Sequence, residues 1–151
     1  MRVCRTLRSF DRSRPITELR AAYTGTEHDF VCTREGSPAS LVVSAGKGPN
    51  HGPMSLLLFG LATCALTDVV TILGKQRAVY SNLECRISAQ RSTEGARPFE
   101  RINLDFRVSG QVTPEQFRRA VDLGWEKYCG VHATLEGGPA QMTIEAHVEK
   151  S

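Results

Sequence analysis

The sequence lacks the features that mark several large protein classes. Its 151 residues carry a net charge of only +3, and aromatic residues make up 7% of the chain. A dense basic stripe with interleaved aromatics is missing, which argues against nucleic-acid binding. No run of about 18 apolar residues is free of polar interruptions, so the sequence predicts no membrane span. The length suffices for one compact domain with its own hydrophobic core.

Cysteine is present in an odd number and without the spacing of a redox or zinc motif. The five cysteines are Cys4, Cys32, Cys64, Cys85 and Cys129. No pair forms a C-x-x-C motif, and we recognise no secretory signal. An odd, widely spaced set argues against a secreted disulfide framework and favours the cytoplasm, where a special cysteine is more often catalytic than structural. We therefore expect a cytoplasmic protein.

The chain is expected to hold a short tail and one domain. Residues 1–15 carry five arginines and one acidic residue, which predicts a flexible tail, although an organelle-targeting peptide has a similar composition. Residues 16–151 are expected to form a single domain. It opens with three short β-like runs that predict a meander. These runs are residues 16–23, 28–33 and 39–44.

A long apolar helix is predicted for residues 53–77, after a loop rich in Gly, Pro and Asn. Pro53 suits the first turn of a helix. Apolar residues occur on nearly every side, which is typical of a helix buried inside a fold. Small residues such as Gly60 and Ala62 allow another element to approach closely.

Two strands, a second helix and a last strand complete the pattern. Apolar and polar residues alternate in 83–90, 101–110 and 141–149, so each strand has one buried face. Between them, Thr113 and Gln116 form a capping box that starts a helix over 113–128. The apolar and small residues of this helix predict a buried stripe that includes Gly124 and Tyr128. The order is βββ–α–ββ–α–β. It predicts an α+β domain with an antiparallel sheet packed on two helices.

Cys64 is the first candidate for chemistry, because Asp68 follows it on the same helical face. A carboxylate in an apolar helix needs a partner or water, so this face is expected to meet something polar. The alternative is a small apolar core residue, since free cysteines are often buried. Cys85 lies on the inward face of its strand and is expected to be such a residue.

Cys129 is the second candidate, in the segment "KYCGVHATL". Gly130 suits the end of a helix, and a helix C-terminus does not lower a thiol pKa. An activating partner must then come from elsewhere, and His132 is near in sequence, although a satisfied structural histidine is the alternative. Cys64, Cys129, His132 and His51 lack the spacing of a zinc site, so we expect no metal.

The combination of these motifs resembles the OsmC/Ohr family. The shared features are a loop ending in "GPMSLLLFGLATCALTDVV", two alternating strands and a helix ending in "EKYCGVHATL". The resemblance covers about residues 16–149 and is strongest to a less characterised OsmC-like branch. It implies an OsmC-like fold and an intertwined homodimer, with two long helices in the middle and active sites at the interface.

The resemblance also implies an activity, the thiol-dependent reduction of organic hydroperoxides in oxidative-stress defence. Cys64 matches the peroxidatic cysteine, which attacks the O–O bond and becomes a sulfenic acid. Cys129 matches the resolving cysteine, which forms a disulfide with it. A dithiol reductant then restores the pair, and the reaction needs neither a metal nor a bound cofactor.

Two positions depart from the pattern of the hydroperoxide-reducing members. Met54 occupies the position of a glutamate at the start of the long helix. An arginine of the early meander has no clear counterpart, because the nearest stretch offers His28, with Arg20 and Arg34 in the neighbourhood. His28, His132 or a residue of the partner chain could take over its role. The departures keep two alternatives open, a non-enzymatic small-molecule-binding protein and a thiol redox sensor.

Overall fold

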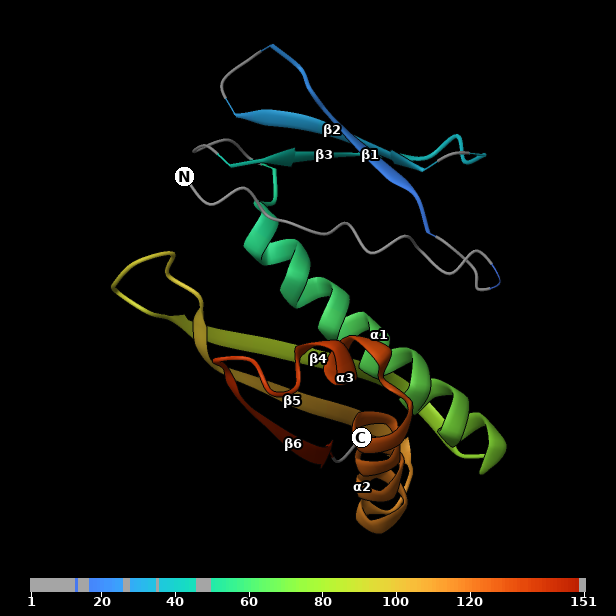
Figure 1. Ribbon diagram of the computed structural model, residues 1–151. Coiled ribbons are helices and arrows are strands. Elements are labelled where there is room, and N and C mark those ends of the chain that lie inside the picture. Colours follow the sequence, from blue (N-terminus) through green and yellow to red (C-terminus); the bar gives the residue numbers. More distant parts are fainter. Residues whose placement is uncertain (1–12, 14–16, 26–27, 35, 46–49, 150–151) are drawn as a thin grey trace. The chain divides into compact units, whose positions relative to one another are not determined.

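The computed structural model describes residues 13, 17–25, 28–34, 36–45 and 50–149. Cys4 and, apart from Ser13, the predicted tail lie outside these residues. Internal contacts divide the chain into two units, Met1–Pro53 and Met54–Ser151 (Figure 1). The single domain expected over 16–151 stays a prediction.

The first unit is a β-meander, as the sequence predicts. Its three antiparallel strands lie in the order β1-β2-β3, with Ala21 opposite Cys32 and Val31 opposite Val42. The strands are β1 (Leu19–Tyr23), β2 (Asp29–Arg34) and β3 (Ser40–Ser44). Their β-branched and aromatic residues suit strands, while Gly25 and Gly36 adopt the positive φ of the intervening turns.

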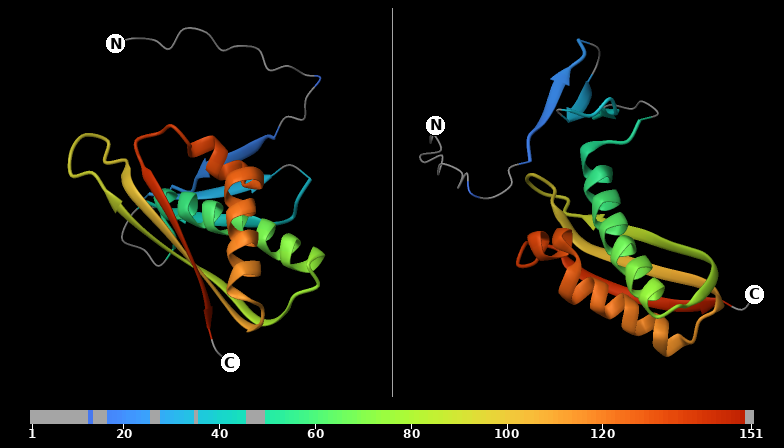
Figure 2. Two further views of the ribbon diagram at one scale, coloured as in Figure 1. Left: turned by 90° about the horizontal axis from the view of Figure 1, so that it is seen from below. Right: turned by 90° about the vertical axis from the view of Figure 1, so that its right-hand side faces the viewer.

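The second unit combines one three-stranded sheet with helices (Figure 2). Its elements are α1 (Pro53–Lys75), β4 (Val79–Arg91), β5 (Phe99–Gln111), α2 (Pro114–Leu123), the π-helical turn η1 (Gly124–Tyr128), α3 (Gly130–Leu135) and β6 (Gln141–Glu149). The strand order β4-β5-β6 makes β5 the central strand. The expected α+β architecture is confirmed.

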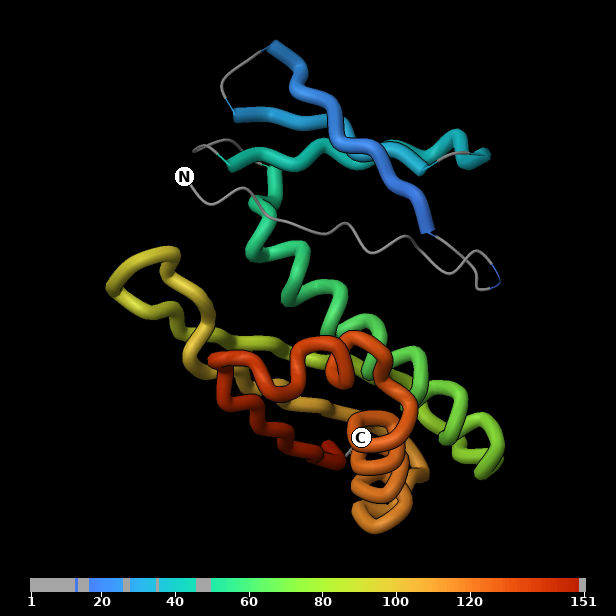
Figure 3. The backbone as a smooth tube through the Cα atoms, viewed as in Figure 1, coloured from blue at the N-terminus to red at the C-terminus, as the bar shows by residue number. Residues whose placement is uncertain are grey.

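The direction of β6 differs from the expectation. β4 and β5 pair antiparallel, but β6 pairs parallel to β5, with Leu104 opposite Ile144. Figure 3 traces the reason: the chain leaves β5, runs back through α2, η1 and α3, and enters β6 in the direction of β5. A crossover of this length produces parallel pairing, whereas a short hairpin would produce antiparallel pairing.

One hydrophobic core lies between this sheet and its helices. The inward-facing residues of β5 alternate with partly exposed neighbours, as the period-two pattern predicts. Buried side chains of α1, α2 and β5 belong to one cluster, so both helices cover the same face of the sheet. The largest fully buried side chains are Phe106, Phe117, Leu61, Leu73, Leu104, Val69, Val108 and Val121. The opposite face is charged, with Arg107 bonded to Asp105 at 2.7 Å.

α1 is less buried than its sequence predicts. Leu61, Val69 and Leu73 are fully buried, but Phe59 and Val70 are 45% and 47% exposed. By length and mean hydropathy alone, α1 could also cross a membrane, a property that it shares with core helices of soluble proteins. The prediction of a helix buried on all sides is therefore wrong for the isolated chain.

The second helix begins as predicted and ends earlier. Thr113 accepts a hydrogen bond from the Gln116 backbone N–H at 3.2 Å, and the Gln116 side chain accepts one from the Thr113 N–H at 3.1 Å. This capping box confirms the predicted start. The α-helix ends at Leu123, however, and the π-helical turn shifts the following residues, so that Tyr128 is 53% exposed rather than buried.

Cys85 provides a prediction about stability at high pH. It packs against the core, and burial, followed by repulsion from Asp105, raises the pKa of its thiol from 9.0 to about 12. Between these values the unfolded chain loses the proton and the folded chain keeps it, so the free energy of unfolding falls as the pH rises.

We expect the free energy of unfolding of Cys85→Ala to fall less steeply with rising pH than that of the parent protein. The measurement is the free energy of unfolding by urea at several values between about pH 8 and pH 10.5. Equal pH dependence in the parent and the variant would contradict the assignment of a raised pKa to the half-buried Cys85. Cys32→Ala is the control, because it changes a cysteine of the other unit.

Candidate active site

Cys64 lies near the middle of α1, where a rigid helix fixes the direction of its side chain. The neighbouring Leu61 and Ala65 are buried in the core, whereas Cys64 is half-buried. Asp68, one turn later, is also half-buried and lies on the same face. Among the described residues its carboxylate has neither a hydrogen-bonding nor an ion-pairing partner. This face of α1 therefore presents one thiol and one carboxylate, and no other described residue bonds to the carboxylate.

Cys129 lies at the junction between η1 and α3, where it ends one element and caps the next. It is only 2% exposed. Its sulfur accepts a hydrogen bond from the backbone N–H of His132 at 3.4 Å, as an N-cap side chain does. The expectation that Cys129 lies at a helix end is confirmed, but the sequence did not indicate that the same residue also caps a further helix that begins at Gly130.

The structure brings Cys64, Asp68 and Cys129 together. The two sulfur atoms and one oxygen of the Asp68 carboxylate all lie within 4.8 Å of one another. The cysteines are 65 positions apart in the sequence (129 − 64), so only the packing of the junction on α1 creates this cluster. Two thiols at this separation can reach disulfide bonding distance through small side-chain rotations.

The environment keeps the Cys129 thiol protonated at neutral pH. Burial is the main cause that raises its pKa from 9.0 to about 11, and the neighbouring Cys64 adds to the shift. Backbone N–H groups of His132 and Val131 act in the opposite direction, because they stabilise the thiolate. At neutral pH Cys129 is therefore a poor nucleophile until it loses its proton.

His132 contributes its backbone to the cluster, while its ring is used elsewhere. Its imidazole stacks on Trp125 with 3.9 Å between ring centroids, and its Nδ1 lies 3.0 Å from the Trp125 carbonyl oxygen. A hydrogen bond at this position requires a proton on Nδ1. The sequence pointed to His132 by proximity alone, and neither its stacking nor the role of its N–H could be inferred without the π-helical turn.

Gly124 is a site residue that the sequence marked only as part of a buried stripe. A Cβ added there would lie 3.2 Å from the Asp68 Cβ and 3.5 Å from a methyl of Val69. The glycine therefore lets the start of η1 approach α1 beside Asp68. This close packing holds the junction that carries Cys129 against the helix that carries Cys64.

Two other positions discussed from the sequence lie outside this cluster. Met54, in the first turn of α1, lines an apolar cavity of about 250 Å³ together with Leu57, Phe99 and Leu135. His28 belongs to the first unit, where its carbonyl oxygen accepts a hydrogen bond from Ala45 N–H at 3.0 Å. Its contribution to the chemistry of Cys64 stays a prediction.

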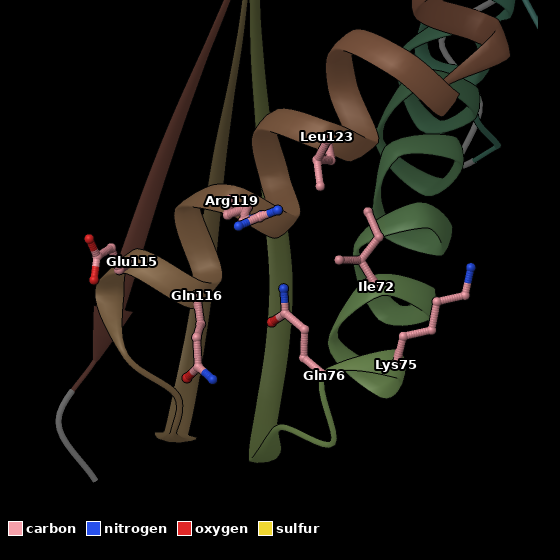
Figure 4. Close-up of a pocket in the computed structure, with 7 residues that line it drawn as sticks. All are labelled: Ile72, Lys75, Gln76, Glu115, Gln116, Arg119 and Leu123. Atoms are coloured by element: carbon pink, nitrogen blue, oxygen red, sulfur yellow. The ribbon is translucent and has the colours of Figure 1, made fainter.

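A second and larger cavity lies between the end of α1 and α2. It has a volume of about 710 Å³, and Figure 4 shows the side chains that line it. Its lining residues are Ile72, Lys75, Gln76, Glu115, Gln116, Arg119 and Leu123. Neither this cavity nor the apolar one is lined by Cys64 or Cys129. Of the two cysteines, Cys64 is the more exposed, since Cys129 is buried.

Comparisons with known proteins agree with this arrangement. A family model described as OsmC-like protein matches residues 45–145, a segment that contains both cysteines and Asp68. Protein YhfA of Escherichia coli K12 is 39% identical over 94 residues, which span 62% of this chain and 69% of YhfA. A hydroperoxide reductase of Mycoplasma pneumoniae is 25% identical over 131 residues, 85% of this chain and 87% of that protein.

A solved structure shares the fold over nearly the whole chain. The crystal structure of a hypothetical protein from Aquifex aeolicus VF5 superposes with a TM-score of 0.81 at 25% sequence identity. The match covers 91% of this chain and 99% of that one. The meander, the long helix and the mixed sheet are thus features of a known architecture.

Proposed function

The chain belongs to the OsmC-like protein family, and we propose that it reduces organic hydroperoxides with Cys64 and Cys129 in defence against oxidative stress. The observation that carries the proposal is the approach of the two sulfur atoms to within 4.8 Å. The similarity to a hydroperoxide reductase supports the same chemistry. We propose the cytoplasm as the compartment, because thiol pairs are kept reduced there.

The reaction proceeds in two steps through the two sulfurs. The Cys64 thiolate attacks one oxygen of the hydroperoxide, the O–O bond breaks, and an alcohol leaves after taking up a proton. Cys64 is now a sulfenic acid. The Cys129 sulfur attacks it, loses its proton and releases water as the disulfide forms. A dithiol reductant returns two electrons and two protons and restores both thiols.

Access and acidity support this division of roles. Cys64 is half-buried, so a small molecule can reach its sulfur, whereas Cys129 is 2% exposed. The pKa of Cys129, raised to about 11, keeps it from competing for the peroxide. A resolving thiol does not need this access, since its target lies beside it.

Asp68 and His132 support the pair in different ways. The Asp68 carboxylate, within 4.8 Å of both sulfurs, can accept the proton of Cys64 and return it to the leaving alkoxide. His132 supports Cys129 through its backbone N–H. The role of His28, which belongs to the other unit, stays the prediction made from the sequence.

We propose a homodimer with the active sites at the interface. Phe59 and Val70, eleven positions apart, lie on one face of α1 and are 45% and 47% exposed in the single chain. Large apolar residues that are exposed on one face of a helix are typical of a surface that another chain covers. An intertwined pair would bury this face.

Val70→Asp tests the dimer. We expect the parent protein to sediment as a dimer and the variant to dissociate at least about tenfold more readily, because the interface would bury an unpaired carboxylate. Sedimentation velocity over a range of concentrations is the measurement. Val79→Asp, at an exposed position of β4, is the matched control. A monomeric parent protein would reject the proposal.

The experiment that tests the activity is a titration of the reduced protein with tert-butyl hydroperoxide and with hydrogen peroxide. We expect loss of two thiols per chain for each peroxide consumed, and a faster reaction with the organic peroxide because apolar residues surround Cys64. Unchanged thiols at a tenfold excess of either peroxide would reject it.

A second candidate function is the binding of a small apolar ligand without turnover. The apolar cavity beside Met54 favours it, because a methionine replaces the carboxylate that the hydroperoxide-reducing members place there. Ligand binding that survives in variants of both cysteines, together with no peroxide consumption, would favour this candidate over the reductase. Slow, substoichiometric thiol oxidation would instead favour a redox sensor.

A further inference from the structure

We propose that the reduced cluster of Cys64, Asp68 and Cys129 binds one thiophilic divalent cation of the Zn²⁺ type. All three ligand atoms lie within 4.8 Å of one another. Zinc–sulfur bonds of about 2.3 Å in a tetrahedral site separate two sulfur ligands by about 3.8 Å. The two sulfurs therefore need to approach each other by roughly 1 Å or less, which rotations about their χ angles can provide.

The chemical nature of the three groups selects the type of cation. Thiolate ligands favour Zn²⁺ and related soft or borderline ions over Mg²⁺ and Ca²⁺, which require oxygen ligands. Two thiolates and one carboxylate supply three charges to a divalent ion. A fourth position remains for water, the pattern of zinc sites with three protein ligands.

The surrounding structure holds the ligands in position. Cys64 and Asp68 project from adjacent turns of one long helix, and the N–H of His132 supports the Cys129 sulfur. Gly124 lies close to the Asp68 Cβ, since a Cβ added to this glycine would be 3.2 Å from it. Hydrogen bonds and packing around the ligands orient them and strengthen metal binding.

The free carboxylate of Asp68 is the second observation that points to a cation. Among the described residues neither an Arg nor a Lys pairs with it, and no hydrogen bond to it is found. The negative charge of this half-buried carboxylate is not compensated by a positive side chain among the described residues. A cation bound between the carboxylate and the two sulfurs would neutralise it.

Another cluster serves as an internal comparison. Asp105, Glu145 and His147 also bring three possible ligand atoms together. There, Arg107 already donates to Asp105 and to Glu149. The positive guanidinium therefore neutralises the carboxylates, and no metal ion is needed. This second group, which we call the outer cluster, contains no sulfur and is expected to show no thiolate–metal absorption.

Metal binding and peroxide reduction compete for the same sulfurs. When a hydroperoxide accepts two electrons and the sulfurs join as a disulfide, the site loses both thiolate ligands and releases the cation. This competition rests on the proposed function. The metal site itself rests only on the reduced side chains and can exist without any reactivity toward peroxides.

The test is a titration of the full-length, reduced, metal-free protein with Co²⁺ and then with Zn²⁺. We expect one Co²⁺ per chain with the sulfur-to-cobalt charge-transfer absorption of a thiolate site and the visible bands of tetrahedral Co²⁺. Zn²⁺ should displace it. Cys64→Ser and Cys129→Ser should each lose about half or more of the charge-transfer intensity.

Two further variants separate the site from general effects on folding. Asp68→Asn should bind Co²⁺ at least about tenfold more weakly while the thiolate absorption is retained at saturation. His147→Ala, in the outer cluster, should bind like the parent. Circular dichroism confirms that each variant is folded. Absence of the charge-transfer band in the reduced parent protein, or its full persistence in Cys64→Ser, would overturn the proposal.

The two proposals can fail independently. A protein that forms the disulfide with peroxide but binds no Co²⁺ rejects only the metal site. A protein that binds Co²⁺ through both sulfurs but consumes no peroxide rejects only the reductase.

Discussion

Replacing Cys64 by serine is expected to slow the consumption of tert-butyl hydroperoxide by at least about a thousandfold. A hydroxyl at this position is not ionised at neutral pH and cannot replace a thiolate as the attacking group. Removal of a nucleophile commonly costs an enzyme several orders of magnitude in rate. Cys129 cannot take over, because it is buried and its pKa is raised to about 11. The measurement is the rate of peroxide loss with a dithiol reductant in excess.

The matched control for this variant is Cys32→Ser. Cys32 is also a half-buried cysteine, but it lies on β2 of the first unit. Its replacement should leave the rate within about twofold of the parent rate. If Cys64→Ser consumes the hydroperoxide as fast as the parent protein, Cys64 is not the peroxidatic residue and the assignment of the site is wrong.

The second large effect is expected for Cys129→Ser, which should separate the first chemical step from the second. Cys64 can still attack the hydroperoxide, so one equivalent is consumed per chain. No neighbouring thiol then closes the disulfide, and Cys64 stays a sulfenic acid or proceeds to the sulfinic acid with excess peroxide. Steady-state turnover should fall by about a hundredfold or more.

Mass spectrometry and stopped-flow kinetics check this second expectation. The variant should show a single burst of peroxide loss and gain the mass of one oxygen atom on the peptide with Cys64. Unchanged steady-state turnover would mean that the dithiol reductant reacts directly with the sulfenic acid. Cys129 would then be a structural cysteine rather than the resolving one.

Local sequence patterns were sufficient to predict most elements of the fold. The alternation in β5, the capping box at Thr113 and the full extent of β6 follow from interactions between residues close in sequence. The direction of β6 could not be inferred in this way, because period-two alternation is the same in parallel and antiparallel strands. The exposed face of α1 was also missed, since the apolar residues of its sequence do not show which sides of the helix the rest of the chain covers.

The candidate site was predicted in part. The spacing of Cys64 and Asp68 places them on one helical face, and this holds in the structure. Their approach to Cys129 depends on the π-helical turn and on Gly124, which involve packing between distant segments. No local pattern encodes that packing, and only the resemblance to a family linked the two cysteines before the structure did.

The most direct test of the account is peptide mapping of the reduced protein after reaction with one equivalent of tert-butyl hydroperoxide. Free thiols are alkylated, the chain is digested without reductant, and linked peptides are identified by mass spectrometry. The account predicts one dominant species in which the peptide of Cys64 is joined to that of Cys129. A disulfide to Cys32 or Cys85 instead, or both Cys64 and Cys129 alkylated after the peroxide has been consumed, would contradict it.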